Sequence, residues 1–482
     1  MVVRKRPELP NPDGLFTFYD MSCEVIDLIL ERLTFKEKIR LERVDTGFGI
    51  RVSRLVKKIT DDDLDPMENY HADHASQERT YLALIRRLKN VQIMDIDKLA
   101  LTDMLAQVLR KKTTVNKYVQ TVADHVWDCS EWNFYLWEGD LKKLYILELL
   151  AKKLNQKKAN YLTKMSIQFS FYRVTDLPLA MDKLMVLLNH CQNVTEFDLM
   201  FYSSNPPENH YDEESKAKLD VFWTHLSGRA TKLKVDFNDG HIGPFYGSPE
   251  KGHYLVNPFV NLTEFVSLKN LIEDKYIKSL CESSKKLKIL KIVSPSMDNL
   301  KSVSNLLELT ELSFNYFAIE SRITRDANQV IFEKFLDNCG SNLDKLELKI
   351  PFQRSDFFNS VQMKCSNLEQ TVIKLRGTPN FFSGTELANV PKLRKLNLDL
   401  KVNESQLRNL LNTCDKLRSL KFDYVEYDLE KVKLQLKPLV IDYSKKNPQR
   451  PINVYVRKHD LSYARRHDDT MDGMVRFKIE LK

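Results

Sequence analysis

The side chains with the most obvious capacity for chemistry are seven cysteines and a closely spaced pair of histidines. The cysteines stand at positions 23, 129, 191, 281, 339, 365 and 414, and no two form a C-x-x-C pair. A thiolate can act as a nucleophile or a metal ligand, and His71 and His74, with Asp73 between them, could also hold a metal. A structural metal site needs about four ligands, and no further cluster accompanies these residues. We therefore predict no metal site and no cofactor.

The sequence signatures of common active sites are missing. The chain has no G-x-x-x-x-G-K-[ST], G-x-S-x-G or H-E-x-x-H motif. Of its 482 residues 13 are glycine, well below the ordinary usage of about 7%. Glycine-rich phosphate-binding loops and nucleotide-binding folds are hard to build from such a composition. We predict that the protein is not an enzyme.

Four of the cysteines end the apolar face of a predicted helix. Apolar residues spaced i, i+3, i+4 and i+7 finish at Cys191, Cys339 and Cys414, and a looser version finishes at Cys365. A short strand motif begins three or four residues after each of them. Small thiols commonly fill core positions of this kind, which favours a structural role over a nucleophilic or metal-binding one.

The strand motif is the string L-x-x-L-x-L, which recurs through the second half of the chain. Its first position falls at residues 343, 368, 393 and 417, in steps of 25, 25 and 24. Further copies, some of them weaker, begin at Leu162, Val194, Leu287 and Leu309. A constant step of about 25 residues is typical of leucine-rich repeats.

The segments CQNVTEFDL, CSNLEQTVI and CDKLRSLKF resemble the cysteine-containing class of leucine-rich repeats, C-x-x-L-x-x-L-x-L. The resemblance implies an α/β fold, a curved leucine-rich-repeat solenoid of helix–turn–strand units with strands on the inner wall and helices on the outer wall. We expect this array over residues 81–435, regular from about residue 276 and degraded before it. Residues 58–80 read as an acidic, polar linker, and residues 436–482 as a C-terminal cap in which INVYVRK and MVRFKIELK pair as a hairpin.

Residues 15–57 predict a module of small helices. Ser22 can cap a first helix, and Thr34 with Glu37 forms a T-x-x-E capping box for a second. The segment resembles an F-box, because the pattern L-P-x-E-V-L followed by V-C-x-x-W is met in register by residues 21–26 and 44–48. The sequence departs from that pattern at Ser22, in place of proline, and at Phe48, in place of tryptophan.

An F-box followed by leucine-rich repeats implies the substrate-recognition subunit of a cullin-type (SCF) ubiquitin ligase, which docks on a Skp-type adaptor and holds a target protein with its repeats. The resemblance places the adaptor contacts, or the core that supports them, at Val25, Ile26, Leu28, Ile29, Leu33, Ile39, Leu41, Val44 and Phe48. Two alternatives remain open. One is a leucine-rich-repeat scaffold unconnected to ubiquitin, whose N-terminal helices cap the array, and the other is a nucleic-acid-binding repeat protein.

The x positions of L-x-x-L-x-L predict the surface that binds a target, because they point away from the core. Early strands carry Glu196, Asp198, Glu264 and Glu311, with Lys291 as an exception. The target-binding candidates on later strands are Lys345, Lys349, Lys374, Lys395 and Lys421, mixed with Glu347, Asp399 and Asp423. We expect this surface to be acidic early and basic late, although ordinary solubilising charge would give a similar pattern.

A glycine-rich stretch at residues 238–259 supplies four further target-binding candidates, Phe245, Tyr246, His253 and Tyr254. Aromatic residues in loops often make strong contacts, but a disordered insertion fits the composition equally well. The net charge of +8 is mild for this length, so nucleic acid is a less favoured partner. No run of 18 apolar residues and no secretory signal pattern occur. We expect a reduced protein of the cytoplasm or nucleus that has no membrane partner.

Overall fold

A computed structural model describes part of the chain. The described residues are 21–33, 37–38, 41, 52, 58–60, 93–95, 131–137, 145, 149, 162–170, 177–203, 213–239, 253–316, 325–350, 356–375, 385, 387, 390–424, 429–446, 452–457 and 474–477. The chain divides into two compact units. The first consists of Met1–Leu136, Asp140–Met165 and Lys183–Asn193, and the second of Trp137–Gly139, Ser166–Asp182 and Val194–Lys482.

Thirteen of the described strands form one sheet in sequence order, from β3 to β15. The strands are β3 Glu131–Trp137, β4 Lys164–Ser170, β5 Glu196–Ser203, β6 Lys232–Asp239, β7 Glu264–Leu271, β8 Ile289–Ser294, β9 Glu311–Tyr316, β10 Lys345–Ile350, β11 Gln370–Leu375, β12 Lys395–Val402, β13 Ser419–Tyr424, β14 Asn453–Arg457 and β15 Met474–Phe477. Pairing is parallel from β5 through β14, and β15 is antiparallel to β14.

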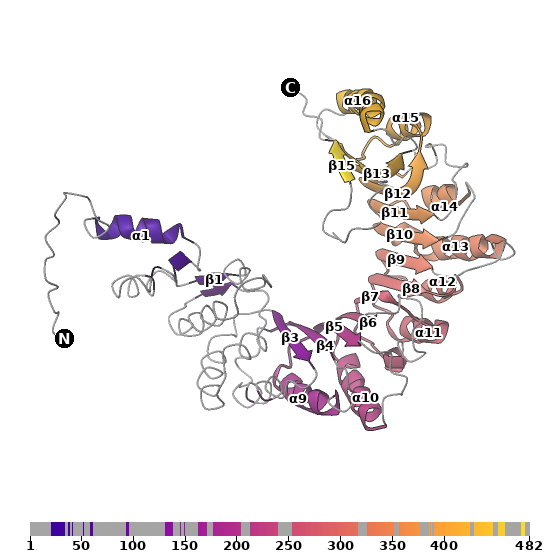
Figure 1. Cartoon of the computed structure of the whole chain (residues 1–482). Coiled ribbons are helices and arrows are strands. Elements are labelled where there is room, and N and C mark those ends of the chain that lie inside the picture. The colour runs from indigo at the N-terminus through magenta and orange to yellow at the C-terminus, as the bar shows by residue number, and fades with distance from the viewer. Residues whose placement is uncertain are drawn as a thin grey trace. The chain divides into compact units, whose positions relative to one another are not determined.

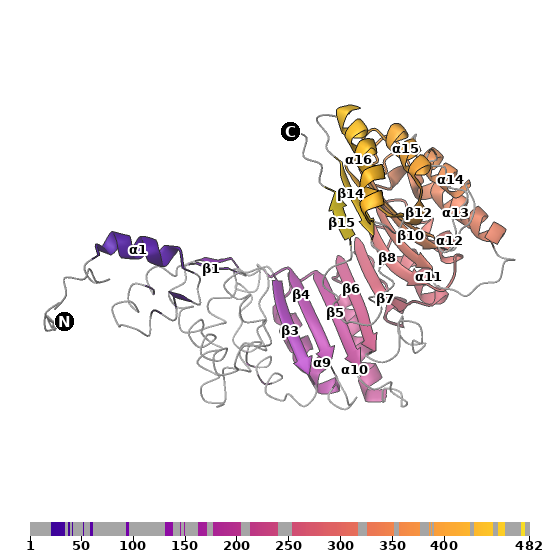
Figure 2. The same ribbon diagram turned by 45° about the horizontal axis from the view of Figure 1, so that its top comes forward.

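Helices alternate with these strands. They are α9 Leu177–His190, α10 Glu213–Ser227, α11 Asp274–Ser283, α12 Asn299–Val303, α13 Arg325–Cys339, α14 Asp356–Lys364, α15 Glu404–Thr413 and α16 Leu429–Lys446, with 3-10 turns η6 His253–Val256 and η8 Gly340–Asn342. In the second unit, helices α10 to α16 lie along one side of the sheet (Figures 1 and 2). Neighbouring parallel strands connected by helices on one face of the sheet form an α/β leucine-rich-repeat solenoid, as predicted.

The repeat step fixes the register of the late strands. Lys345, Gln370, Lys395 and Ser419 are successive in-register partners, so the steps of 25, 25 and 24 residues read from the leucines are confirmed. The leucines of each motif point into the core: Leu346, Leu348, Leu396 and Leu398 are buried. Because side chains alternate along a strand, the residues between them lie on the face opposite the helices, called here the strand face.

The helix–strand pattern continues into residues 436–482, the predicted C-terminal cap. Helix α16 packs beside α15, and β14 pairs in parallel with β13, so together they form one more helix–strand unit. The predicted hairpin of β14 and β15 is confirmed, with Val454 opposite Phe477 and Val456 opposite Val475. From β5 onward, the pairing changes from parallel to antiparallel at this last strand.

The N-terminal part holds helix α1, Cys23–Glu31, and a separate parallel pair of strands, β1 Lys58–Thr60 and β2 Ile93–Asp95. The expected linker at residues 58–80 therefore begins in a strand, and its residues 61–80 lie outside the described part of the chain. Among the described helices, none combines the length and the apolar character needed to cross a bilayer.

Candidate protein-interaction site

Helix α1 begins as its sequence predicts. Ser22 is extended, with φ −64° and ψ 153°, and its Oγ accepts a hydrogen bond from the Val25 N–H at 3.4 Å. Glu24 lies in the first turn, where a carboxylate interacts favourably with the positive end of the helix dipole. The serine that replaces the proline of the F-box pattern thus serves as the N-cap of this helix.

The apolar residues of α1 divide into a buried and an exposed set. Ile26 and Leu30, four residues apart, are buried. Val25 is 44% exposed and Leu28 is 59% exposed, and Ile29 beside them is half-buried. Exposed apolar side chains one helical turn apart are a feature of helices that dock on a partner.

The remaining adaptor candidates are less informative. Leu33 and Leu41 are half-buried, which suits residues that support a helix rather than contact a partner directly. Ile39, Val44 and Phe48 lie outside the described residues. The strongest adaptor candidates are therefore Val25 and Leu28.

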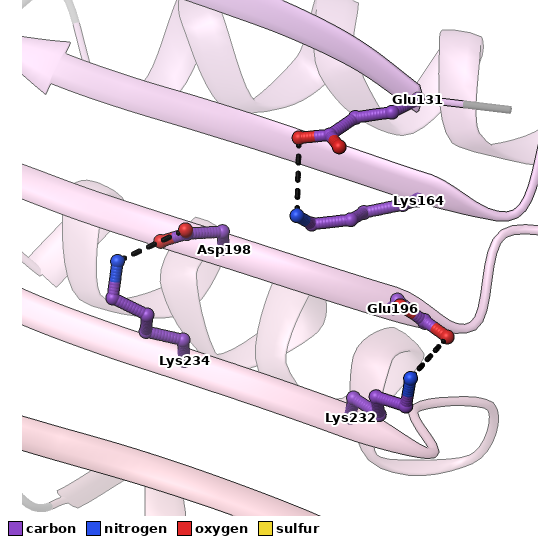
Figure 3. Close-up of polar contacts among 6 residues, drawn as sticks. All are labelled: Glu131, Lys164, Glu196, Asp198, Lys232 and Lys234. Atoms are coloured by element: carbon purple, nitrogen blue, oxygen red, sulfur yellow. Dashed lines mark hydrogen bonds and ion pairs between the residues drawn. The ribbon is translucent and has the colours of Figure 1, made fainter. Parts of the chain in front are cut away.

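The early part of the strand face carries ion pairs between neighbouring strands. Lys232 Nζ lies 2.8 Å from Glu196 Oε1, and Lys234 Nζ lies 3.0 Å from Asp198 Oδ2, so both pairs join β5 to β6 (Figure 3). The hydrogen bond with Glu196 raises the pKa of Lys232. In register, Glu196, Lys232 and Glu264 follow one another across three strands with alternating charge.

A third pair belongs to the first unit. Lys164 Nζ of β4 lies 3.1 Å from Glu131 Oε1 of β3, and the side chain of Glu131 is nearly buried (Figure 3). Lys164 holds the third position of the weak motif copy that begins at Leu162, whereas no sequence motif pointed to Glu131. A buried carboxylate requires such a partner, because burial without one is costly.

The early strand face carries more lysines than the sequence prediction counted. That prediction counted Glu196 and Asp198 of β5 but missed strand β6, whose two lysines neutralise them. The string ATKLKV at residues 230–235 is a weak copy of the strand motif, with alanine in place of the first leucine, and could have indicated this strand. Acidic residues still outnumber lysines on this face of β5 to β9, which carries Glu196, Asp198, Asp236, Glu264 and Glu311 beside Lys232, Lys234 and Lys291.

At the centre of the sheet, Glu311 of β9 is shared by lysines of both neighbouring strands. Its carboxylate lies 2.7 Å from Lys291 Nζ and 3.3 Å from Lys345 Nζ. Burial by itself would raise the pKa of Glu311, but hydrogen bonds and charge from the two lysines outweigh it and lower that pKa. Lys345, a target-binding candidate, therefore has a structural contact and is also half exposed, at 51% of its side chain.

The other lysine candidates gather on four adjacent strands. Lys349 of β10 and Lys374 of β11 are in-register partners, Lys395 of β12 is exposed, and Lys421 of β13 is half-buried. An irregularity in β12 places Lys401, not Asp399, opposite Asp423 of β13. The structure thus brings the late lysines together on neighbouring strands, as the sequence predicts. We call Lys345, Lys349, Lys374, Lys395 and Lys421 the lysine sector.

Tyr254 is a core residue, so the prediction that it contacts a target is wrong. It is buried in η6 and stacks on Trp223 of α10, with ring centroids 4.7 Å apart. Burial raises the pKa of its hydroxyl above the ordinary value. Of the other residues proposed for this loop, His253 begins η6, and Phe245 and Tyr246 lie outside the described part.

The cysteines that end the repeat helices are buried, as predicted. Cys191, Cys339, Cys365 and Cys414 are free thiols in the core, and Cys281 of α11 is a fifth. Burial raises the pKa of Cys339 and Cys414 to about 11 and that of Cys281 and Cys365 to about 12. Thiols held in the protonated form are poor nucleophiles and poor metal ligands.

Within the described ranges, no three histidine, cysteine, aspartate or glutamate side chains gather closely enough to hold a metal ion. His71, Asp73 and His74 lie outside those ranges.

Comparison with known proteins gives limited further information. No family model matches the chain, and no curated protein matches it. Among solved structures, the chain is similar to a TLR13–ssRNA13 complex, with 15% identity and a TM-score of 0.35 over 69% of this chain and 43% of that chain. It is also similar to a Rad7 and Elc1 complex in yeast, with 13% identity and a TM-score of 0.29 over 90% of this chain and 92% of that chain.

The chain therefore spans less than half of the TLR13 complex chain that it matches. At TM-scores this low, neither likeness carries an argument about partners or activity. The fold assignment rests on the repeat step, the parallel register and the helices on one face of the sheet.

Proposed function

We propose that this protein is the substrate-recognition subunit of an SCF-type ubiquitin ligase. Its N-terminal module would dock on a Skp-type adaptor, and its repeats would hold a target protein. The observation that carries the proposal is the pair of exposed apolar side chains, Val25 and Leu28, on a capped helix that precedes the repeat array and matches the F-box pattern in register.

The proposed mechanism is positioning, without bond chemistry in this chain. A target held on the repeats and a ubiquitin donor held through the adaptor would react as if at high local concentration. The repeat fold suits this role, because stacked units present an extended surface for protein contacts.

The test is a pull-down of the full chain with a purified Skp-type adaptor. The double variant Val25→Asp/Leu28→Asp should lower adaptor affinity by more than about tenfold, because buried apolar anchors dominate such interfaces. The matched control is Leu307→Asp/Met363→Asp, which introduces the same charge at side chains that are 65% and 79% exposed in the repeat array. The control should bind the adaptor as the native chain does.

Two results would contradict the proposal. One is the absence of adaptor binding by the native chain, and the other is unchanged binding by Val25→Asp/Leu28→Asp when circular dichroism shows that the variant is folded. Either result would leave the repeat array as a scaffold unconnected to this adaptor.

A further inference from the structure

Strand β7 departs from regular pairing near its end. Its pairing with β6 ends at Val266, which lies opposite Lys234, and its pairing with β8 passes from Ser267 directly to Leu271. Residues 268–270 therefore form a bulge in the strand. Bulges re-aim side chains and are common beside functional sites.

A buried carboxylate fixes the start of this bulge. The backbone N–H of Leu268 donates a hydrogen bond of 3.2 Å to Asp236 Oδ1 of β6, and Asp236 is only 3% exposed. A side-chain oxygen thus satisfies a donor that has left the ladder of strand hydrogen bonds. The conformation of the bulge is therefore held by a specific contact.

The bulge exposes an apolar side chain on the strand face. Leu268 is 45% exposed, whereas Val266 of β7 and Val293 of β8, on the same face, are 8% and 4% exposed. With the half-buried Ile289 of β8, these side chains form what we call the apolar strip. A scattered exposed leucine needs no explanation, but Leu268 is held in place by a bulge and a dedicated acceptor.

The two lysines that border the apolar strip are already paired with acidic residues farther out. Lys234 of β6, in register with Val266, reaches Asp198 of β5 at 3.0 Å (Figure 3). On the other side of Val266, Lys291 of β8 reaches Glu311 of β9 at 2.7 Å. Both ammonium groups therefore bond to the strand farther from β7, and their charges are matched there.

Glu264 is the carboxylate that stays available beside the strip. It begins β7, lies on the same face as Val266 and Leu268, and is half-buried. Within the part of the chain that the structure describes, it makes no ion pair: its register neighbour Lys232 bonds to Glu196, and its neighbour on β8 is Ile289. A cation of a bound partner could therefore pair with Glu264.

We propose that β7 binds an extended segment of the target protein, whose apolar side chain packs on Leu268 and whose lysine or arginine pairs with Glu264. This inference rests on the proposed function, since it names the chemistry of the target that the repeats would hold. Glu264 and Leu268 are four residues apart, about 13 Å along a strand, so an extended partner carries its two side chains four positions apart. Acidic residues outnumber lysines on this face of β5 to β9, in contrast to the lysine sector, which favours a cationic partner.

The experiment measures binding of the full-length protein to a fluorescein-labelled peptide by fluorescence anisotropy. The peptide carries one leucine and one arginine four positions apart in a background of serine and threonine. Leu268→Ser should weaken binding by at least about tenfold, because it removes the apolar anchor. The matched control, Leu307→Ser, removes a leucine that is 65% exposed in the turn before β9 and should change binding by less than about twofold.

The charged contact is tested by changing both of its partners. Glu264→Gln should weaken binding of the arginine peptide by about threefold, since exposed ion pairs contribute modestly. A peptide with glutamine in place of arginine should bind native protein and Glu264→Gln equally, because the pair is already absent. Equal weakening of both peptides by Glu264→Gln would overturn the inference. The matched control, Glu308→Gln, removes the same charge at an exposed position in the turn before β9 and should affect neither peptide.

Thermal unfolding separates a binding defect from a folding defect. Leu268→Ser and Leu307→Ser both change exposed side chains, so their melting temperatures should lie close to that of the native chain. Glu264→Gln keeps the shape of the side chain and tests the site independently of any loss of folding. Unchanged peptide binding by folded Leu268→Ser would overturn the inference, and so would the lack of saturable binding by the native chain.

Sedimentation tests whether a second copy of this chain covers the apolar strip instead. The native chain and Leu268→Ser should sediment alike in the absence of peptide. A dimer of the native chain that Leu268→Ser dissociates would assign the strip to self-association and overturn the inference.

The adaptor pull-down separates this site from the ligase role. Leu268→Ser should leave adaptor binding unchanged, because Leu268 lies in the repeat array and not in the N-terminal module. Peptide binding without adaptor binding would therefore refute the ligase role alone, and adaptor binding without peptide binding would refute the β7 site alone.

Discussion

Gly340 follows α13 directly and lies against the last residue of α14. A Cβ atom on Gly340 would stand 2.9 Å from the carbonyl oxygen of Lys364 and 3.3 Å from its carbonyl carbon. Both are backbone atoms, which cannot move aside as the end of a side chain can. Glycine is therefore required here by the close approach of two consecutive repeat units.

We predict that Gly340→Ala lowers the free energy of unfolding by about 1–3 kcal/mol, because an added methyl group forces the two units apart. The matched control is Gly228→Ala, where the nearest atom, the His225 carbonyl oxygen, would be 3.9 Å from the new Cβ. The control should change stability by less than about 0.5 kcal/mol. Urea unfolding of both variants provides the measurement, and equal effects would contradict a steric cause.

The buried thiols illustrate what single positions reveal in a sequence. Helical spacing that ends in cysteine predicted buried, structural thiols, and the core positions of Cys191, Cys339, Cys365 and Cys414 agree with that prediction. Tyr254 was misjudged because its sequence surroundings are polar and glycine-rich. Its burial depends on Trp223, thirty-one positions earlier in the chain, and no local pattern indicates that contact.

Pairs of strands carry the next level of organisation. The register of β5 with β6 joins Glu196 to Lys232 and Asp198 to Lys234, which are 36 residues apart in each case. Both pairs are partly exposed, so solvent and salt screen them and each contributes modestly. The observed register is the one that pairs both carboxylates, because a two-residue shift of β6 would set either Asp198 against Asp236 or Glu196 against Ala230.

A charge swap tests that register. Glu196→Lys should lower the free energy of unfolding by about 0.5–1 kcal/mol, because it faces Lys232 with a like charge. Adding Lys232→Glu to the same chain should restore most of that loss, since the pair is then reversed rather than broken. Urea unfolding at low and at about 0.5 M salt provides the measurement, and the differences should shrink at high salt. A double variant no more stable than Glu196→Lys would contradict the pairing.

The array as a whole depends on how its ends are closed. Each unit buries its apolar face against its neighbours, so a terminal unit needs a cover. At the C-terminal end, antiparallel β15 pairs with β14 and occupies the edge that would otherwise offer free hydrogen-bonding groups. The reversal of strand direction marks this end of the sheet.

Removal of residues 472–482 should make the protein aggregate at lower temperature than the full chain, because the edge of β14 becomes available for pairing between molecules. Light scattering during a thermal ramp provides the measurement. Tyr455→Lys in the shortened chain should reduce the aggregation, since a charge on an edge strand opposes edge-to-edge pairing. A shortened chain with unchanged scattering would show that β15 does not protect this edge.

The sequence by itself determined the repeat architecture, because its signals are local. A helix repeats every 3.6 residues and a strand every two, so leucine and cysteine spacing within 25 residues identifies both elements and their buried faces. The late step of 25, 25 and 24 residues carried over directly into strand register. The alternation of side chains along each strand also predicted that the late lysines lie on the strand face.

The tertiary structure decided which residues meet across strands and which surfaces stay exposed. The neutralisation of Glu196 by Lys232, the register that sets Lys349 beside Lys374, and the irregularity in β12 all depend on pairing between distant segments. The same holds for α1, where Val25 is exposed and Ile26 is buried, although both were adaptor candidates. Local periodicity specifies a face, whereas contact between faces is set by loop lengths and packing that no short pattern contains.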